Sequence, residues 1–244
     1  MKTTSDAIDE AQPAWILHAR PYRETSLLVE AFCLQYGRVG FIARGVRSQR
    51  SQPLRAALQP LQALLLTLRG RGELLQLASA ETHDVAVALR GRPLLSAFYV
   101  NELLLALLPR QQPQTALFWR YGVCINALSD EANLGWTLRC FERDLIAALG
   151  YAMKLDRDAN GNPINHDASY RFDPERGAIA ARRDSPESLS GESLLALAQD
   201  VLPSAALQAE LRALMRRVIR WRLGGRELRS WRILAELQSV SSAD

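Results

Sequence analysis

The spacing of apolar residues changes near Glu81, and this change constrains the fold more than any other feature of the chain. Before Glu81, apolar and polar side chains alternate in five short stretches, as expected for half-buried strands. After it, apolar residues recur at the 3.6-residue period of a helix. The sequence therefore predicts an α+β protein in which a β domain is followed by a mostly helical part.

The five expected strands cover residues 14–19, 26–34, 38–44, 61–68 and 73–80. Glycines mark the tight turns between them, at Gly37 and at Gly70 with Gly72. The longest connection, residues 45–60, follows the third strand. This order favours a five-stranded closed barrel of the OB type over residues 1–82, with a small sandwich as the alternative.

The remainder, residues 83–244, reads as a helical domain. Pro93 marks a helix start and Pro109 a stop. Further helices are expected over residues 115–128, 133–149, 191–201, 205–223 and 227–237. Turn residues interrupt the pattern from about 154 to 189 and predict a polar insertion with a short hairpin, 169–172 paired with 178–181.

Positive charge is concentrated in two segments of the 244-residue chain, whose formal net charge is only +4. Residues 38–72 contain seven arginines and no acid, and residues 210–232 contain eight arginines and two glutamates. The rest of the chain is therefore acidic. Such clustering is typical of a protein that binds a polyanion.

The first basic segment lies on a predicted strand and the loop after it. Alternation places Arg38 and Arg44 on one face of the strand, and Arg47, Arg50 and Arg55 continue into the loop. Guanidinium groups at this spacing can contact successive phosphates, and OB barrels commonly bind single strands. A solvated loop without a partner is the alternative. The nearby aromatic residues that could stack on bases are Tyr22, Tyr36 and Phe41.

The second basic segment is predicted to be an amphipathic helix. Its apolar stripe leaves four arginines mostly outside: Arg212, Arg216, Arg217 and Arg220. An ordinary solvated face would look the same. A face that binds the carboxylates of an acidic peptide is the functional alternative.

Signatures of catalysis and of bound metal are weak. The chain has no nucleophile elbow, P-loop, dinucleotide fingerprint or zinc-protease motif, so no enzyme and no cofactor are expected. Asp156, Asp158 and Asn160 match the start of a calcium loop, but position twelve is Asp167 instead of Glu, which favours a turn-rich surface loop. The apolar runs are too short to span a membrane, so a cytoplasmic location is expected.

Short motifs also follow one another in the order of one protein family. In the β part they are Ile16-Leu17-His18 with Arg20 and Tyr22, Glu24-Thr25-Ser26-Leu27, Gly37-Arg38, Ala43-Arg44-Gly45, Arg47 to Arg50-Ser51 and Leu58-Gln59-Pro60. In the helical part they are Tyr99 to Leu103, Leu138-Arg139 with Phe141-Glu142, Leu149-Gly150-Tyr151, Leu223-Gly224-Gly225 and Leu228 to Ser230. On these motifs the chain resembles the RecO family of bacterial recombination mediators, nearly from end to end.

The resemblance implies a non-enzymatic DNA-repair protein with an N-terminal OB-fold and a C-terminal helical domain. It implies binding of single- and double-stranded DNA, annealing of complementary strands, and a nucleoid-associated location. It also implies that the partner RecR acts with the protein when RecA replaces the single-strand DNA-binding protein SSB, in the RecF pathway. A helical adaptor with an OB domain and an RNA-binding OB protein are the alternatives that the residues leave open.

The same resemblance assigns residues. DNA contacts transfer by position to Arg44, Arg47 and Arg50, and Arg38 and Arg55 join them on the charge argument. The family binds the acidic tail of SSB through its helical domain, where the candidate face is that of Arg212, Arg216, Arg217 and Arg220. Many relatives carry a four-cysteine zinc module where this chain has residues 154–189, and that segment holds no cysteine here. No structural zinc is therefore expected.

Overall fold

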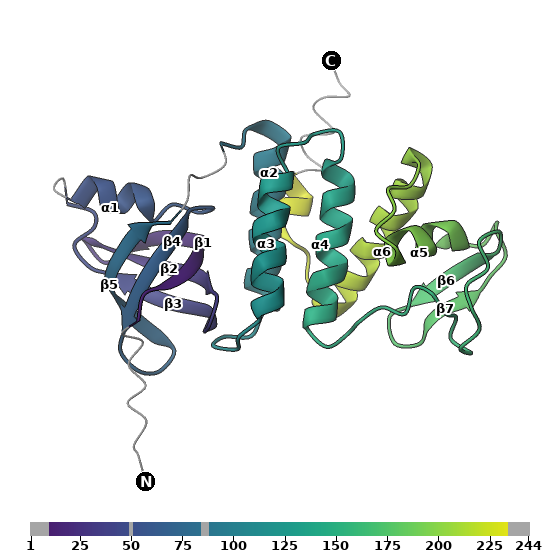
Figure 1. The fold of residues 1–244 in the computed structure, drawn as a ribbon, viewed down its shortest axis with the longest axis horizontal. Helices are drawn as coiled ribbons and strands as arrows, with labels where there is room; N and C mark the ends of the chain where they lie inside the picture. The colour runs from purple at the N-terminus through teal and green to yellow at the C-terminus, as the bar shows by residue number, and fades with distance from the viewer. Residues whose placement is uncertain (1–9, 49–50, 84–87, 234–244) are drawn as a thin grey trace, which may run out of the picture. The chain divides into compact units, whose positions relative to one another are not determined.

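The computed structural model describes residues 10–48, 51–83 and 88–233 (Figure 1). Its contacts divide the chain into two compact units, residues 1–126 and 127–244. The first contains the barrel, with a short helix in the connection after its third strand, and two longer helices. The second contains further helices and a small sheet.

The predicted barrel is confirmed. Five strands close in the order β1-β2-β3-β5-β4, and the pairing of β3 with β5 is parallel, whereas the other pairings are antiparallel. Closure into one barrel excludes the sandwich. The connection after β3 contains a short helix, α1, that the sequence pattern did not predict. The bounds are β1 Gln12–Tyr22, β2 Ser26–Cys33, β3 Gly37–Ala43, α1 Gln52–Ala57, β4 Ala63–Arg69 and β5 Leu74–Thr82.

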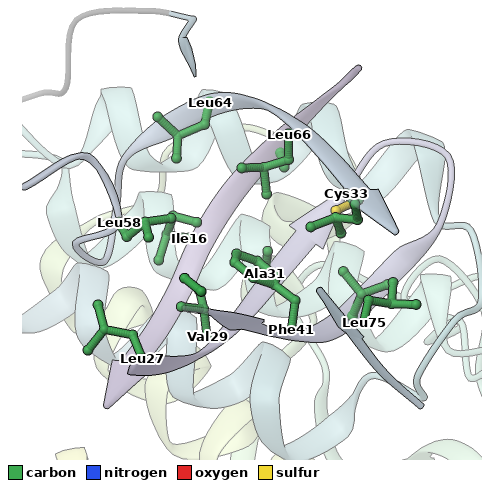
Figure 2. Close-up of a cluster of buried hydrophobic side chains, with 14 of the residues drawn as sticks. Ile16, Leu27, Val29, Ala31, Cys33, Phe41, Leu58, Leu64, Leu66 and Leu75 are labelled. Atoms are coloured by element: carbon green, nitrogen blue, oxygen red, sulfur yellow. The ribbon is translucent and has the colours of Figure 1, made fainter. Parts of the chain in front are cut away.

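Alternation along the strands fills the barrel interior. Inward-facing residues such as Ile16, Val29 and Leu66 are fully buried, and Figure 2 shows them gathered between the strands. Leu58, which caps the end of α1, joins the same cluster. The core therefore anchors the long connection after β3 as well as the strands.

Two helices, α2 (Gly91–Leu107) and α3 (Thr115–Ala127), pack on the outside of β1 and β2 in the same unit. Asn101 on α2 donates a 2.8 Å hydrogen bond to the carbonyl oxygen of Leu17. Edge-to-face ring contacts join Trp15 to Tyr121 and Phe32 to Phe118. The compact unit therefore extends beyond the barrel to residue 126.

The second unit combines the helices α4, α5 and α6 and a helical segment at residues 229–233 with a sheet of order β7-β6-β8. The predicted hairpin is confirmed as β6 and β7, and β8 is an additional strand. The bounds are α4 Leu134–Ala148, β6 Ser169–Asp173, β7 Gly177–Ala180, β8 Ser188–Ser190, α5 Gly191–Ala198 and α6 Ala205–Arg222. Residues 229–233 are helical, whereas residues 227 and 228 of the helix expected over 227–237 are not, and residues 234–237 lie outside the described residues. Within the described ranges, no helix combines the length and the apolar character that crossing a bilayer requires.

Candidate nucleic-acid interface

The β1–β2 turn and the loop after β3 are joined at one end of the barrel. The backbone N–H of Arg47 donates to the carbonyl oxygen of Thr25 at 3.0 Å. Its guanidinium donates to the carbonyl oxygens of Arg23 at 3.1 Å and Glu24 at 3.0 Å. Arg23 has a φ of 51°, an uncommon conformation for a residue other than glycine, which these bonds help to hold. The two loops therefore form one surface.

Four exposed arginines lie on these loops and on the strand that leads into them. Arg20 pairs with Leu28, which pairs in turn with Ile42, so Arg20 lies in a row across three strands. Arg44 is exposed in the turn directly after β3, two residues beyond Ile42. We call this set the turn-end arginine surface; its members are Arg20, Arg23, Arg44 and Arg47.

The sequence argument identified Arg44 and Arg47 but not Arg20 or Arg23. Only the pairing of the β1–β2 hairpin brings the latter two to the loop after β3. Of the other predicted residues, Arg55 is exposed in the last turn of α1, and Arg50 lies outside the described residues. Glu24 is the only acid in the segments 20–25, 44–48 and 52–57, so these segments are strongly positive.

Arg38 occupies a different environment from the other predicted DNA contacts. It is six residues from Arg44 along β3, a separation of about 20 Å in a strand. Its guanidinium donates to the carbonyl oxygens of Leu108, at 3.0 Å, and Leu105 at the end of α2. Its side chain is 15% exposed and its Nε lies 3.4 Å from Oε2 of Glu30. Arg38 therefore lies apart from the turn-end arginine surface, and its contact with DNA stays a prediction.

Burial lowers the pKa of Arg38, while Glu30 opposes this effect and Arg110 adds to it. Arg110 itself forms an ion pair with Glu30. The segment between α2 and α3 thus brings a second guanidinium to the carboxylate that faces Arg38. The three charges form a structural network at the start of β3.

The chain's own helices cover part of the barrel face that OB-folds commonly use. That face is formed by strands β2 and β3 and is flanked by the β1–β2 and β4–β5 loops. Here Phe32 on β2 contacts Phe118 on α3, with ring centroids 5.5 Å apart. A Cβ atom at Gly40 would lie 2.7 Å from the Arg110 guanidinium. The turn-end arginine surface and Arg71 in the β4–β5 loop lie outside the covered part and are exposed.

The barrel offers little aromatic surface for bases. Phe41 is buried in the core, and Tyr36 packs against that core. Tyr22 is half-buried, with the Arg23 guanidinium 5.4 Å from its ring centroid. The barrel end is therefore rich in charge and poor in exposed rings.

The α6 arginines are divided between solvent and intramolecular contacts. The predicted apolar stripe of α6 is buried. Arg212 and Arg220 are exposed. Arg216 lies 4.0 Å from a carboxylate oxygen of Glu227, and Arg217 lies 3.8 Å from one of Glu187. Two of the four guanidiniums thus already bind carboxylates of this chain.

An apolar groove of about 230 Å³ lies between β1 and α3 in the first unit. Its lining contains Trp15, Trp119 and Val123, and His83 is its only titratable side chain. It lacks arginine or lysine, which an acidic peptide would need. The groove is therefore a poorer candidate for binding an acidic peptide than the arginine face of α6.

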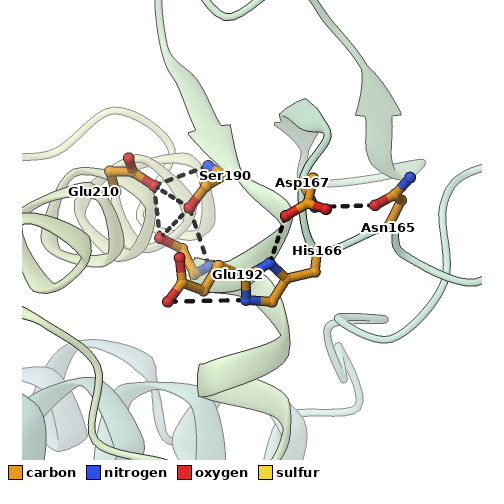
Figure 3. Close-up of polar contacts among 7 residues, drawn as sticks. Asn165, His166, Asp167, Ser190, Glu192 and Glu210 are labelled. Carbon is orange, nitrogen blue, oxygen red and sulfur yellow. Dashed lines mark hydrogen bonds and ion pairs between the residues drawn. The ribbon is translucent and has the colours of Figure 1, made fainter.

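Ser190 and His166, which Figure 3 labels, make cap and turn contacts. Ser190 and Ser193 both donate through Oγ to Glu210, at 2.9 and 2.6 Å, and Ser190 caps α5. His166 bonds Asp167 at 2.9 Å and lies 3.9 Å from Glu192. His166 contacts Asp167 and Glu192, whereas Ser190 and Ser193 contact Glu210. Neither serine is therefore paired with the histidine as a nucleophile with its base.

The predicted calcium-like loop is a turn stabilised by one aspartate. Oδ1 of Asp158 accepts the backbone N–H groups of Asn160 and Asn162, at 2.9 and 2.8 Å. These bonds lower the pKa of Asp158, with the side chain of Asn162 contributing most. Across the described residues, no group of three or more His, Cys, Asp and Glu side chains is placed to hold a metal ion.

A zinc module does not fit the residues of the polar insertion. Segment 154–189 contains no cysteine, and the thiols of Cys33 and Cys124 are buried elsewhere in the chain. The insertion instead has apolar contacts of its own, with Tyr170, Phe172 and Leu189 buried. Strand pairing and these side chains account for its order without a metal.

Comparison with protein families decides the relationship. Residues 8–86 match the family model described as Recombination protein O N terminal, and residues 91–232 match Recombination protein O C terminal. The chain belongs to the Recombination protein O family. The similarity to proteins named DNA repair protein RecO is also extensive. That of Xanthomonas oryzae pv. oryzae (strain PXO99A) is 46% identical over 233 residues, covering 93% of this chain and 97% of the relative.

A second relative is equally similar. DNA repair protein RecO of Stenotrophomonas maltophilia (strain K279a) is 47% identical over 232 residues, again covering 93% of this chain and 97% of the relative. Membership in the Recombination protein O family supports a role in DNA repair and recombination. The two family models together span both the barrel and the helical part.

Proposed function

We propose that this chain is a non-enzymatic recombination mediator that binds single- and double-stranded DNA and anneals complementary strands. The turn-end arginine surface is the observation that carries the proposal. Arg50, and Arg55 on α1, are further proposed DNA contacts. Arg38 joins β3 to the end of α2 through its hydrogen bonds to Leu105 and Leu108. The relatives named DNA repair protein RecO support this function, and the action takes place on cytoplasmic, nucleoid DNA.

Charge neutralisation explains annealing. Two single strands repel each other through their phosphates, and arginines that contact both backbones reduce that repulsion. Arg47 donates to the carbonyl oxygens of the β1–β2 turn and so fixes the relative position of the two loops. The neighbouring guanidiniums of Arg23 and Arg44 then face DNA in a prearranged set. Binding of this kind depends strongly on salt and little on sequence.

The proposal includes the protein partners of a mediator. With RecR, the chain promotes RecA loading on DNA coated with SSB, and it binds the acidic SSB tail through the α6 face. Arg216 and Arg217 support that face because each already lies near a glutamate carboxylate. Carboxylates of the peptide would replace Glu227 and Glu187, while the exposed Arg212 and Arg220 bind further acidic groups.

The deciding experiment compares two triple variants in fluorescence anisotropy titrations with a labelled single strand over a series of salt concentrations. Changing Arg20, Arg44 and Arg47 to Gln removes three charges from the turn-end arginine surface and keeps a hydrogen-bond donor at position 47. The salt slope should fall by about two for three lost phosphate contacts. The matched control, Arg92, Arg182 and Arg183 to Gln, removes three exposed charges elsewhere. Equal isotherms for the two triple variants would refute the proposed surface.

Two further measurements separate this function from its alternatives. Wild-type chain should anneal complementary strands with no partner present, which a protein that only docks other proteins need not do. In competition, single-stranded DNA should displace RNA of the same sequence, since an RNA-specific protein would show the reverse preference.

The proposed contact between α6 and the SSB tail has a separate test. Complementary strands coated with SSB should anneal in the presence of the chain, and removal of the SSB tail should abolish this. Reversing Arg212 and Arg220 to Glu should have the same effect on coated strands but not on bare ones. Full activity of that variant on coated strands would exclude the α6 face as the peptide site.

A further inference from the structure

The guanidinium of Arg222 contacts two aromatic rings in the second unit. Its central carbon is 3.3 Å from the ring centroid of Tyr151 and 4.2 Å from that of Trp221. Cation–π contacts at this range are favourable and orient the rings. We call these three residues the aromatic–arginine stack.

The ends of two helices build the stack. Tyr151 follows α4, where Gly150 has a φ of 86° and the N–H of Tyr151 donates to the carbonyl oxygen of Ile146 at 3.1 Å. Trp221 and Arg222 form the last turn of α6. The carbonyl ends of both helices favour a positive charge at this place. The rings are therefore held by backbone structure as well as by Arg222.

Tyr151 and Trp221 nevertheless remain about half exposed. Tyr151 is 50% exposed and Trp221 is 44% exposed. Nε of Arg222 is buried and has no hydrogen-bond partner within the described part of the chain. The fold thus places two rings in contact with one guanidinium while leaving about half of each aromatic residue exposed.

The barrel exposes little aromatic surface, whereas the aromatic–arginine stack exposes two rings. The barrel supplies arginines but buries Phe41 and packs Tyr36 against its core. Among the described barrel strands, Leu74 is the large apolar side chain left exposed. A protein that holds unpaired strands needs ring surface for bases as well as charge for phosphates. The aromatic–arginine stack provides that ring surface.

We propose that Tyr151 and Trp221, braced by Arg222, stack on unpaired bases of single-stranded DNA and form a second contact outside the barrel. This inference rests on the proposed function, since it assumes that the chain binds single strands. Arg220 and Lys154, which are exposed and lie near the rings in sequence, would contact the flanking phosphates. Duplex DNA offers no free base faces, so the stack would select unpaired strands.

The test uses two labelled strands of equal length and backbone charge, an oligothymidylate and the same backbone without bases. The full wild-type chain should bind the oligothymidylate more tightly than the abasic strand. Changing Tyr151 and Trp221 together to Leu should reduce this preference about tenfold or more and leave the affinity for the abasic strand unchanged. Trp119→Leu is the matched control, because Trp119 is 59% exposed and its ring packs edge-to-face on Phe118, with centroids 5.4 Å apart.

A second measurement tests the proposal even if the double variant with Leu at positions 151 and 221 fails to fold. Trp221→Phe keeps a ring at the position but removes one indole, so it should retain the base preference and lose part of the tryptophan quenching caused by oligothymidylate. Trp119→Phe should keep that quenching. An unchanged base preference in a folded Leu variant, or unchanged quenching in Trp221→Phe, would overturn the stack. Failure of the wild type to bind either strand would instead overturn the proposed function.

Discussion

The hydroxyl of Tyr121 on α3 donates a 2.6 Å hydrogen bond to Oδ1 of Asn101 on α2. Both side chains are buried, and the amide nitrogen of Asn101 donates in turn to the carbonyl oxygen of Leu17 on β1. One amide therefore joins the two helices to each other and to the barrel. Because the Asn101 amide lies in an apolar contact, no water can take its place as the hydrogen-bond partner of Tyr121 and Leu17.

Replacing Asn101 by Leu should destabilise the chain. The substitution leaves the carbonyl of Leu17 and the hydroxyl of Tyr121 without this partner, and each buried polar group that loses its partner costs about 1–3 kcal/mol. Urea denaturation measures the loss. Tyr121→Phe is the milder control, since it removes only the hydroxyl. An Asn101→Leu protein as stable as the wild type would show that the amide carries no part of the helix–barrel contact.

Gly37 and Gly45 provide a matched pair at the two ends of β3. Both have positive φ, 65° and 68°, so alanine at either position has a strained backbone that costs about 1–2 kcal/mol. A Cβ at Gly37 would also lie 1.9 Å from the carbonyl oxygen of Gln112, whereas a Cβ at Gly45 has open space. Gly37→Ala should therefore lower the free energy of unfolding well beyond Gly45→Ala. Equal losses in denaturant titrations would refute the close approach.

Arg38 and Arg44 should respond oppositely to substitution by Gln. Arg38→Gln removes hydrogen bonds to Leu105 and Leu108, so we expect a stability loss of about 1–3 kcal/mol with a small change in DNA affinity. Arg44→Gln removes an exposed charge, so we expect weaker DNA binding with little change in stability. Thermal melts and anisotropy titrations of both variants check this. A stable Arg38→Gln protein with lost DNA binding would instead confirm the predicted contact of Arg38 with DNA.

The barrel could be predicted because each strand has one buried face, and residues such as Val29 and Phe41 keep the period of two visible. The helix α1 is only six residues long, too short for a helical period to appear, and β8 has three residues. Their positions follow from packing, as the burial of Leu58 next to α1 illustrates. Local pattern does not contain that information.

The interface was harder to predict than the fold. Alternation gives Arg38 and Arg44 the same side of β3, but it does not reveal that the segment between α2 and α3 covers one end of that strand. Arg20 and Arg23 lie in a segment that also contains Glu24, so their charge did not stand out. Their proximity to the loop after β3 comes from strand pairing. Tertiary contacts, which one sequence read alone does not show, decide which arginines are exposed together.

His166 should make stability depend on pH. Its hydrogen bond with Asp167, assisted by Glu192, raises its pKa above the usual value near 6.5. The protonated form is therefore favoured in the folded state, so its stabilisation is complete below the unfolded pKa and is lost as pH rises through the folded value. His166→Gln should remove this part of the pH dependence, and His18→Gln is the control. Identical pH profiles for wild type and His166→Gln would contradict the contact.

The polar insertion should keep its structure without zinc. Strand β6 pairs with both β7 and β8, and Tyr170, Phe172 and Leu189 are buried among these strands. Segment 154–189 offers no cysteine to a metal. A strong chelator should therefore leave the melting temperature unchanged, whereas a family member that has the four cysteines should be destabilised. Elemental analysis completes the test, because about one zinc per chain would contradict this account of the insertion's stability.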